Sequence, residues 1–497
     1  MTTVSATRSP WLVEDAPTAP AAAGALTADV LVIGAGITGA TTALLLARAG
    51  LDVIICEAAT VAGGASGLNT AKVSALQATI YSDLTHYHGA ETAAAYAAAS
   101  MAGVETVAEL AGLFAPDAGL RRRPAATVAG TREQLEQVNA ELVAADAAGV
   151  PVRVCDEIDA PIPCFGGVCL DDQLSLHPVR YVRGLITAAQ AAGARLYEHS
   201  RALSVKTGSP HRVQTADAEI SARHVVVAGH YPMFDRGLYF ARLEARRSYC
   251  VGAPLQGDAP ETMAITAGEP TRSFAVVDGM AILGGEGHTA GDRDIRPDRY
   301  ERLARDLRAW CQVSDVPFRW SAQDPVSIDR LPMIGPYLPG AHGLWVATGY
   351  GKWGLSTGTV AAGILTDLVM GRQSPWAQTF HPARLKLRST PKLAKLGTKT
   401  AVDLIGDRLR PGDAASVEAV APGTAAVIRE GRKQMGVYRD NDGVAHKVSL
   451  RCTHLGCLLR FNAAETSWDC PCHGSRFDVD GEVLEGPAVH PLPPGEQ

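Results

Sequence analysis

Two short segments near the C-terminus combine the residue types that bind soft metal ions. Cys452 and His454 form a Cys-x-His pair, and fifteen residues later Cys470 and His473 form a Cys-x-x-His pair. Thiolate and imidazole groups are ligands of both zinc and iron–sulfur centres. A zinc finger usually takes its cysteines as one pair and its histidines as another. Each segment here supplies one of each, which favours an iron–sulfur site over a zinc site.

The two segments, Cys452-Thr453-His454-Leu455-Gly456-Cys457 and Cys470-Pro471-Cys472-His473-Gly474-Ser475, resemble those of the Rieske [2Fe–2S] domain. The resemblance implies that Cys452 and Cys470 bind one iron and that His454 and His473 bind the other. Because two neutral imidazoles replace two thiolates, such a cluster carries less negative charge and has a higher reduction potential than a ferredoxin cluster.

Other residues of these segments extend the resemblance beyond the ligands. Cys457 and Cys472 occupy positions that form a disulfide in Rieske proteins of respiratory cytochrome bc complexes, so the resemblance implies the same bond here. Ser475 matches a serine that donates to a bridging sulfide, whereas Phe477 replaces a tyrosine that donates to a cysteine sulfur. A missing donor lowers the potential. We therefore expect a potential below the respiratory range and above that of plant-type ferredoxins.

A second candidate site follows the apolar run 29–33 near the N-terminus. This run is typical of a buried parallel strand and leads directly into Gly34-Ala35-Gly36-Ile37-Thr38-Gly39, after which a helix is predicted over 40–50. In such a motif the first glycine permits a tight turn and the second lets the backbone approach a pyrophosphate. The third glycine lets helix and strand pack closely. The motif predicts a dinucleotide-binding unit.

The same unit supplies groups for the phosphates and for a ribose. The start of the helix, around Ile37 and Thr38, offers free N–H groups and a partial positive charge to the phosphates. Glu57 ends the second predicted strand (51–56), eighteen residues beyond Gly39, where a carboxylate accepts hydrogen bonds from the ribose hydroxyls. A basic residue at this position would have indicated a 2′-phosphate instead.

The chain also resembles the D-amino acid oxidase/glycine oxidase family of FAD enzymes over residues 28–375. This resemblance rests on the motif above together with Gly63-Gly64-Ala65-Ser66-Gly67-Leu68-Asn69-Thr70, Val225-Val226-Val227-Ala228-Gly229 and Leu344-Trp345-Val346-Ala347-Thr348-Gly349. It implies that FAD is bound and that a hydride passes to it from a carbon that bears an amine.

The family resemblance assigns further cofactor contacts. Ser66 and Asn69 would lie by the pyrophosphate and flavin, and the backbone of Ala202 would face the adenine. The helix after Gly349 would direct its N-terminus at the flavin pyrimidine, with Lys352 near the flavin O2. A cation or N–H donor there stabilises the anionic reduced flavin. A surface lysine in a loop is the alternative reading of Lys352.

One segment departs from the family pattern. Oxidases that react fast with oxygen commonly carry a lysine near the flavin, but the nearest match, Gly284-Gly285-Glu286-Gly287-His288, has none. We therefore expect weak oxygen activation and another exit for the electrons. His288 is either an active-site group or a structural histidine. Two interpretations are open for Arg246, Arg247 and Tyr249. Their side chains face a substrate carboxylate, or they lie on the solvent-exposed face of a strand.

Composition excludes several classes of function. The 497 residues carry 46 Lys and Arg against 52 Asp and Glu, a net charge of −6, so no nucleic-acid partner is expected. The uncharged stretch 30–47 is long enough to cross a membrane, but glycines interrupt it and strand, turn and helix explain it better. The N-terminus shows no signal-peptide pattern. We expect no membrane span and a cytoplasmic location.

The motifs divide the chain into four parts. We expect a flexible N-terminal lead-in over 1–27, an FAD-dependent oxidoreductase domain over 28–375, a linker with a short helix over 376–415 and a Rieske domain over 416–497. The oxidoreductase domain is expected to combine an α/β, Rossmann-like FAD-binding fold of the glutathione-reductase type with an α+β substrate domain. The Rieske domain is expected to be small and all-β.

Together the sites predict a flavin enzyme with its own electron exit. An amine or amino-acid-like substrate would give two electrons to FAD, and the cluster, which holds one, would pass them singly to an external acceptor. Two alternatives remain. An external donor could feed the cluster so that the flavin reduces a substrate, or the Rieske module could be a redox sensor or docking element on an ordinary amine oxidase.

Overall fold

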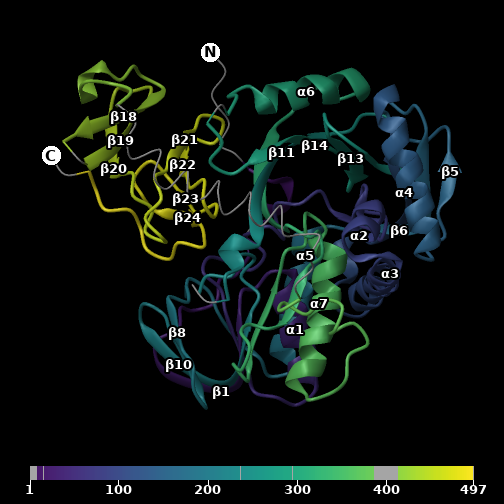
Figure 1. Cartoon of the computed structure of the whole chain (residues 1–497), viewed down its shortest axis with the longest axis horizontal. Helices are drawn as coiled ribbons and strands as arrows, with labels where there is room; N and C mark the ends of the chain where they lie inside the picture. The colour runs from purple at the N-terminus through teal and green to yellow at the C-terminus, as the bar shows by residue number, and fades with distance from the viewer. Residues whose placement is uncertain are drawn as a thin grey trace.

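The computed structural model describes residues 8–14, 16–234, 237–293, 295–384, 412–431 and 433–495. The short helix expected in the linker, around 401–409, lies outside these residues. The described chain forms two large sheets with their helices and two small sheets near the C-terminus (Figure 1).

The first large sheet builds the dinucleotide-binding fold predicted from the glycine motif. Its strand order is β16-β17-β10-β1-β2-β7, and all neighbours are parallel except β16 and β17. Its strands are β1 (Gly24–Ile33), β2 (Val53–Cys56), β7 (Arg195–Tyr197), β10 (Ala218–Val227), β16 (Met333–Pro336) and β17 (Leu344–Thr348), with the hairpin β8 (Ser204–Lys206) and β9 (His211–Gln214) on β10. Three helices that are distant in the sequence pack together beside this sheet, namely α1 (Ile37–Arg48), α5 (Pro178–Ala191) and α7 (Gly354–Val369) (Figure 1).

The second large sheet forms the substrate domain, at the upper right of Figure 1. Its order is β15-β11-β14-β13-β12-β4-β6-β3, with β5 on β6. Its strands are β3 (Lys72–Val73), β4 (Arg121–Val128), β5 (Arg153–Cys155), β6 (Gly167–Ser175), β11 (Leu243–Pro254), β12 (Met263–Thr266), β13 (Arg272–Val277), β14 (Met280–Thr289) and β15 (Phe318–Ser327). Its helices are α2 (Ile80–His88), α3 (Ala90–Phe114), α4 (Leu135–Ala147) and α6 (Arg299–Trp310).

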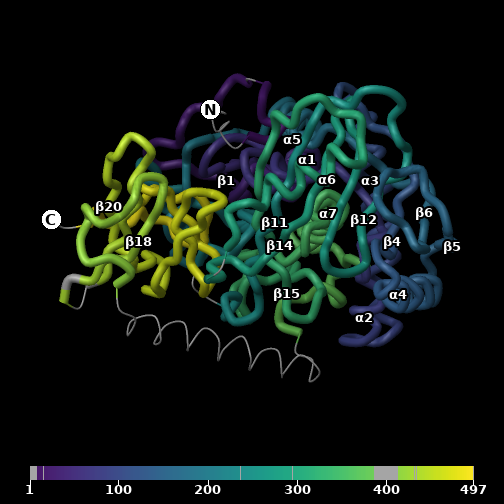
Figure 2. Tube along the Cα trace, turned by 90° about the horizontal axis from the view of Figure 1, so that it is seen from above, coloured from purple at the N-terminus to yellow at the C-terminus, as the bar shows by residue number. Residues whose placement is uncertain are grey.

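Two small antiparallel sheets form the C-terminal module, as expected for a Rieske domain. They consist of β18 (Thr424–Glu430), β19 (Lys433–Arg439) and β20 (Ala445–Ser449), and of β21 (Arg460–Asn462), β22 (Ser467–Asp469), β23 (Arg476–Phe477) and β24 (Val483–Glu485). Figure 2 shows this module beside the part of the second large sheet that contains β11 and β14. Trp468 and Phe477 are fully buried in its core.

Part of the segment expected to be a flexible lead-in over residues 1–27 is described by the structure and contacts the folded chain. Trp11 is buried, packs edge-on against His177 and donates from Nε1 to the carbonyl of Asn69 at 2.9 Å. Strand β1 already begins at Gly24. The sequence pattern missed these contacts because a Pro-, Ala- and Thr-rich segment with one tryptophan has no periodicity, although burying one large aromatic ring suffices to anchor a short segment.

Helix α3 is the one described helix that is long and apolar enough to cross a membrane. Such a test is also passed by core helices, and α3 packs against α7, α5 and α2 with Tyr96 and Val107 buried. The segment 30–47 forms β1 and α1 with the turn between them, as predicted.

The structure contains a disulfide that the sequence did not predict. Cys155 on β5 and Cys169 on β6 are bonded, with their Cα atoms 6.0 Å apart. Strands β5 and β6 are antiparallel neighbours, which brings the two cysteines together. Because the pairing depends on a cross-strand register, their separation in the sequence gave no sign of it.

Candidate functional site

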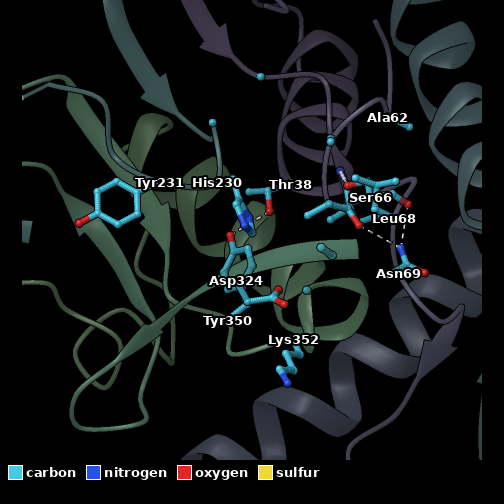
Figure 3. Close-up of a pocket in the computed structure, with 18 of the residues that line it drawn as sticks. Thr38, Ala62, Ser66, Leu68, Asn69, His230, Tyr231, Asp324, Tyr350 and Lys352 are labelled. Carbon is cyan, nitrogen blue, oxygen red and sulfur yellow. Dashed lines mark hydrogen bonds between the residues drawn. The ribbon is translucent and has the colours of Figure 1, made fainter. Parts of the chain in front are cut away.

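A large cavity lies where the two large sheets meet (Figure 3). The end of β1 and the start of α1 line it on one side, and the start of α7 and the strands β11, β14 and β15 line the other. Ligands of open parallel sheets bind outside the carboxyl ends of the strands, which is where this cavity lies.

The glycine motif lines one wall of the cavity and fits the roles expected of it. Gly34 has a φ of +105°, and a Cβ there would lie 2.7 Å from the Ala228 carbonyl oxygen. A Cβ on Gly39 would lie 1.8 Å from the Gly34 carbonyl oxygen, so only glycine lets α1 approach β1 this closely. At Gly36 a Cβ would fall 2.9 Å from Ser66 Oγ and would fill the space beside the helix start.

Two helices present their N-termini to the cavity. Helix α1 begins after Gly36 and α7 after Trp353, and neither of these N-cap residues supplies a side-chain hydrogen bond to its helix. Ile37 and Thr38 of α1 and Gly354 of α7 line the cavity. Unsatisfied N–H groups and the helix dipole favour anionic groups at both places. The arrangement therefore fits a pyrophosphate at α1 and an electron-rich ring edge at α7.

The C-terminal module brings its four expected metal ligands together. The Nδ1 atoms of His454 and His473 lie 3.2 Å apart, as they would when directed at one iron. Cys452 and Cys470 are buried free thiols whose hydrogen bond lowers the pKa of Cys452 and raises that of Cys470. Burial lowers the pKa of His473 to about 3, so its imidazole is neutral, the form that binds metal.

The remaining cysteines of the two loops are bonded to each other. Cys457 and Cys472 form a disulfide, the pairing implied by the Rieske resemblance. Their sulfurs and that of Cys470 lie within 4.8 Å of one another, but the disulfide leaves only Cys470 of the three as a free thiol. Ser475 also bonds to the Cys452 side chain. This donor set fits a [2Fe–2S] cluster with two cysteine and two histidine ligands.

Two protein-family models match the chain. The model described as FAD dependent oxidoreductase (DAO) matches residues 29–368, and the Rieske [2Fe-2S] domain model matches residues 411–494. The chain belongs to the DAO family. It is a DAO-family FAD oxidoreductase with a C-terminal Rieske domain, which confirms both resemblances and the cofactors FAD and [2Fe–2S].

One relative is similar to nearly the whole chain, and others are similar to the larger part of it. YhfW of Bacillus subtilis, described as a Rieske 2Fe-2S iron-sulfur protein, is 32% identical over 96% of this chain and 95% of its own length. Gamma-glutamylputrescine oxidoreductase of Escherichia coli is 25% identical over 70% of this chain and 84% of its own. Glycine oxidase from Geobacillus kaustophilus has the same fold, with a TM-score of 0.61, 20% identity and coverage of 72% of this chain and 99% of its own.

The residues expected at the AMP half of FAD surround one end of the cavity. Glu57 lines it, and its carboxylate accepts from Ala35 N at 2.8 Å and from Ala59 N at 2.9 Å. Burial raises the pKa of Glu57 despite these bonds. Ala202 is buried and lines the same end, beside Arg201. Both expected contact residues are therefore near each other in this DAO-family fold.

Ser66 and Asn69 shape the turn beside α1. Ser66 Oγ accepts from Ile37 N at 2.9 Å, at the start of the helix. Asn69 donates to the Ser66 carbonyl at 2.7 Å and accepts from Ala71 N at 2.7 Å, so its side chain holds the turn in shape. Both residues line the cavity (Figure 3).

Lys352 lines the cavity, whereas Gly349 does not. Gly349 has a φ of +81° at the end of β17 and so turns the chain toward α7. Lys352 is drawn with the other lining residues in Figure 3, and desolvation lowers its pKa while the charge of Asp324 partly offsets this effect. Lys352 thus lies beside the N-terminus of α7, as the family resemblance implied.

Sequence reasoning missed three titratable residues that line the cavity. Lys72 donates to the Ala264 carbonyl at 3.2 Å and to Ser273 Oγ at 2.5 Å, and burial lowers its pKa to about 7. His230 and Asp324 also line the cavity (Figure 3). Lys72 follows the quoted Gly63–Thr70 turn by two residues, but Asp324 belongs to no motif.

His288 is separated from the cavity. Its Nε2 lies 3.0 Å from the Tyr249 hydroxyl and its Nδ1 bonds to the Thr289 carbonyl at 2.8 Å. Desolvation lowers its pKa, so the neutral ring suits these contacts. Gly284 and Gly285 of the same strand do line the cavity. A catalytic role for His288 stays a prediction that this position does not favour.

Arg247 and Tyr249 face the Rieske domain rather than a substrate. Arg247 is fully buried and pairs with Glu485 of β24, while Tyr249 lies 3.5 Å from Asn462 Oδ1. Arg476 of β23 pairs with Glu485 at 3.0 Å, so two arginines share one carboxylate. Arg246 of β11 pairs with Glu244 at 3.3 Å.

The second cluster loop rests directly on the oxidoreductase domain. Gln323 of β15 donates from Nε2 to the Gly474 carbonyl at 2.7 Å, next to the ligand His473. The Gln323 carbonyl in turn accepts from Nε2 of the cavity residue His230 at 2.5 Å. Residues 486–489 of the Rieske domain line the cavity itself, and Ala488 N donates to Ser475 Oγ at 3.0 Å.

Proposed function

We propose that this protein oxidises an amine or amino-acid-like substrate with FAD and passes the electrons one at a time through its own Rieske cluster to an external acceptor. Two similar proteins support the substrate class by their names, gamma-glutamylputrescine oxidoreductase and glycine oxidase. FAD, when bound, accepts a hydride from carbon, and the cluster accepts single electrons. We also propose that the protein works in the cytoplasm on a small-molecule substrate.

The observation that carries this proposal is the short hydrogen-bonded connection between residues that line the cavity and the cluster loop 470–475. Residues 486–489 line the cavity and bond to Ser475, and Gln323 links His230 to Gly474. Two short protein paths therefore connect the two cofactor sites. A module that served only for external docking would not need its ligand loop buried against the flavin cavity.

The chain's own residues hold the cofactor in this proposal. We assign the phosphates to Gly34, Gly36, Ile37, Thr38 and Gly39, and the AMP half to Glu57 and Ala202. A second group holds the turn and the flavin edge, namely Ser66, Asn69, Gly349 and Lys352. The Lys352 ammonium and the α7 N-terminus stabilise negative charge that develops at the ring edge. Cys452, His454, Cys470 and His473 hold the cluster.

The test is anaerobic stopped-flow mixing of the holoenzyme with a panel of amines and amino acids. We expect flavin bleaching first and cluster reduction after a lag. In Cys452→Ser, flavin bleaching should persist while no electrons reach a cluster, and cytochrome c reduction should stop. Rapid peroxide formation in air, equal in wild type and Cys452→Ser, would instead favour a sensor or docking role. Flavin reduction only through a reduced cluster would favour the reverse flow.

A further inference from the structure

The cavity contains one carboxylate that the cofactor assignment does not use. Among the described residues that line it, Glu57 and Asp324 are the acidic ones. The Glu57 carboxylate accepts from two backbone N–H groups at the nucleotide end. Asp324 lies on β15 opposite Arg246 of β11, and its side-chain carboxylate has no hydrogen-bond or ion-pair partner in the part of the chain that the structure describes. Figure 3 draws its side chain among the cavity residues.

The surroundings of Asp324 suit a carboxylate that binds and releases a cation. It faces charged and titratable groups from every neighbouring element, namely Lys352, His230, Arg246, Arg247 and Glu485. Desolvation raises the pKa of Asp324, and the nearby positive charges partly offset this effect. A partly buried carboxylate without a fixed partner gains from a cationic ligand, because the ligand supplies the missing charge and hydrogen bond.

The proposed reaction requires a proton acceptor. An amine is a cation at neutral pH, with its lone pair held in an N–H bond. A hydride leaves the neighbouring carbon only when that lone pair is free to form the C=N bond. Lys72 does not meet this need, since it donates to Ala264 and Ser273. The Nε2 atom of His230 does not meet it either, since it donates to the backbone carbonyl of Gln323.

We propose that Asp324 binds the substrate ammonium group and takes its proton. The N–H bond breaks, the proton goes to the Asp324 carboxylate, and the electron pair stays on nitrogen. The C–H hydrogen then leaves with two electrons to FAD, and the nitrogen pair forms the C=N bond. The sum, CH–NH3+ to C=NH2+ with two electrons and two protons released, balances. This inference rests on the proposed function. It limits the substrates to amines whose protonated form has an N–H, which excludes quaternary ammonium compounds, and whose neighbouring carbon has a C–H.

The inference predicts how pH acts on flavin reduction. Only ionised Asp324 accepts a proton, so the second-order rate constant of flavin reduction rises with pH through the Asp324 pKa. In Asp324→Asn this rise with pH is lost, and the rate constant falls about 100-fold or more, which is the usual contribution of a general base. The defect shrinks as pH approaches the pKa of the free substrate, because solution then supplies neutral amine.

The experiment compares wild type, Asp324→Asn and Asp324→Glu by anaerobic stopped flow, with the amine that bleaches wild-type flavin fastest in the panel. Infrared difference spectra of the same reaction should show a new protonated carboxyl band in wild type that is absent in Asp324→Asn. Asp324→Glu should keep a pH limb and a carboxyl band. FAD content and the cluster EPR signal establish that the variants fold.

Two outcomes overturn the inference. One is a pH profile in Asp324→Asn equal to that of wild type, and the other is a defect of constant size at every pH, which would indicate a structural role. These results leave the proposed function standing, because wild-type flavin is still bleached by an amine. If no amine bleaches wild-type flavin, the proposed function fails and this inference fails with it.

Discussion

The two loops that supply the cluster ligands contain the same residue types but lie in opposite environments. In the loop 470–475, His473 is 2% exposed, its ring meets Phe240 at 5.3 Å, and Gly474 accepts a hydrogen bond from Gln323. In the loop 452–457, His454 is only half-buried and the neighbouring Leu455 is 42% exposed. The loop 470–475 packs against the oxidoreductase domain, and the loop 452–457 is the more exposed of the two. The ligand motifs therefore determine which cluster is bound, and the contacts of the loop 470–475 with Gln323 and Phe240 determine which side of the Rieske domain faces the oxidoreductase domain.

The largest expected effect tests the property that the two loops share, which is that each supplies one thiolate ligand. Cys452→Ser and Cys470→Ser each remove one of the two thiolate ligands, so each should abolish the cluster and its rhombic EPR signal in the dithionite-reduced protein. FAD should remain bound in both. Cys311→Ser, a free cysteine far along the chain from the loops, is the control and should keep the full signal. A cluster retained in either ligand variant would show that the ligand set is wrong.

A matched pair of glycines, one in each loop, tests the difference in packing between the two loops. Gly474 and Gly456 have similar φ values of +78° and +75°, so alanine strains both backbones alike, by about 1–2 kcal/mol. A Cβ on Gly474 would also lie 2.5 Å from Ala245 Cβ and 2.6 Å from Gln323 Nε2, whereas at Gly456 it would meet only the flexible Arg451 side chain at 3.2 Å.

Gly474→Ala should therefore push the Rieske domain away from the cavity. We expect cluster reduction after substrate mixing to slow about tenfold or more, since overpacking commonly costs about 1–3 kcal/mol. Gly456→Ala should keep the wild-type rate of this internal step. Stopped-flow absorbance of the flavin and cluster measures it directly. Equal rates in the two variants would indicate that the buried loop is not the electron entrance.

Gln323→Leu should have a smaller effect on the same internal step. The substitution removes the donor to Gly474 and leaves that carbonyl buried without its partner, which costs about 1–3 kcal/mol. The loss of this hydrogen bond should lower the free energy of unfolding measured in urea and should slow cluster reduction. Gln323→Glu gives a contrasting case, because an ionised carboxylate cannot donate and repels the Gly474 carbonyl. A rate in Gln323→Leu above that of wild type would contradict the proposed path.

The comparison also separates what the sequence could predict from what it could not. The glycine motif and the four cluster ligands act through fixed local spacing, so Gly34 to Gly39 and Cys452 to His473 were identifiable. Gln323 and Asp324 gain their roles from the pairing of β15 with β11 and from docking of a second domain. Such contacts join residues that are 76 to 151 positions apart, and no local pattern encodes them. Arg247 was read as a substrate or solvent-facing residue for the same reason.

The smallest expected effect concerns the outward loop. Leu455→Lys changes an exposed side chain, so stability should change by less than about 0.5 kcal/mol and flavin-to-cluster transfer should not change. Cytochrome c, a large carrier that must approach His454, should reoxidise the cluster more slowly, because the added cation repels its basic surface. Ferricyanide, a small anion, should not be slowed.

Val444→Lys is the control for this last variant, since Val444 is 56% exposed on the same domain but outside both cluster loops. It adds the same charge without changing the surface beside His454. Slower cytochrome c reduction in Leu455→Lys alone would mean that electrons enter at the buried loop and leave at the exposed one. An equal slowing in both variants would mean that overall charge governs the encounter, and the two loops would then differ in packing but not in function.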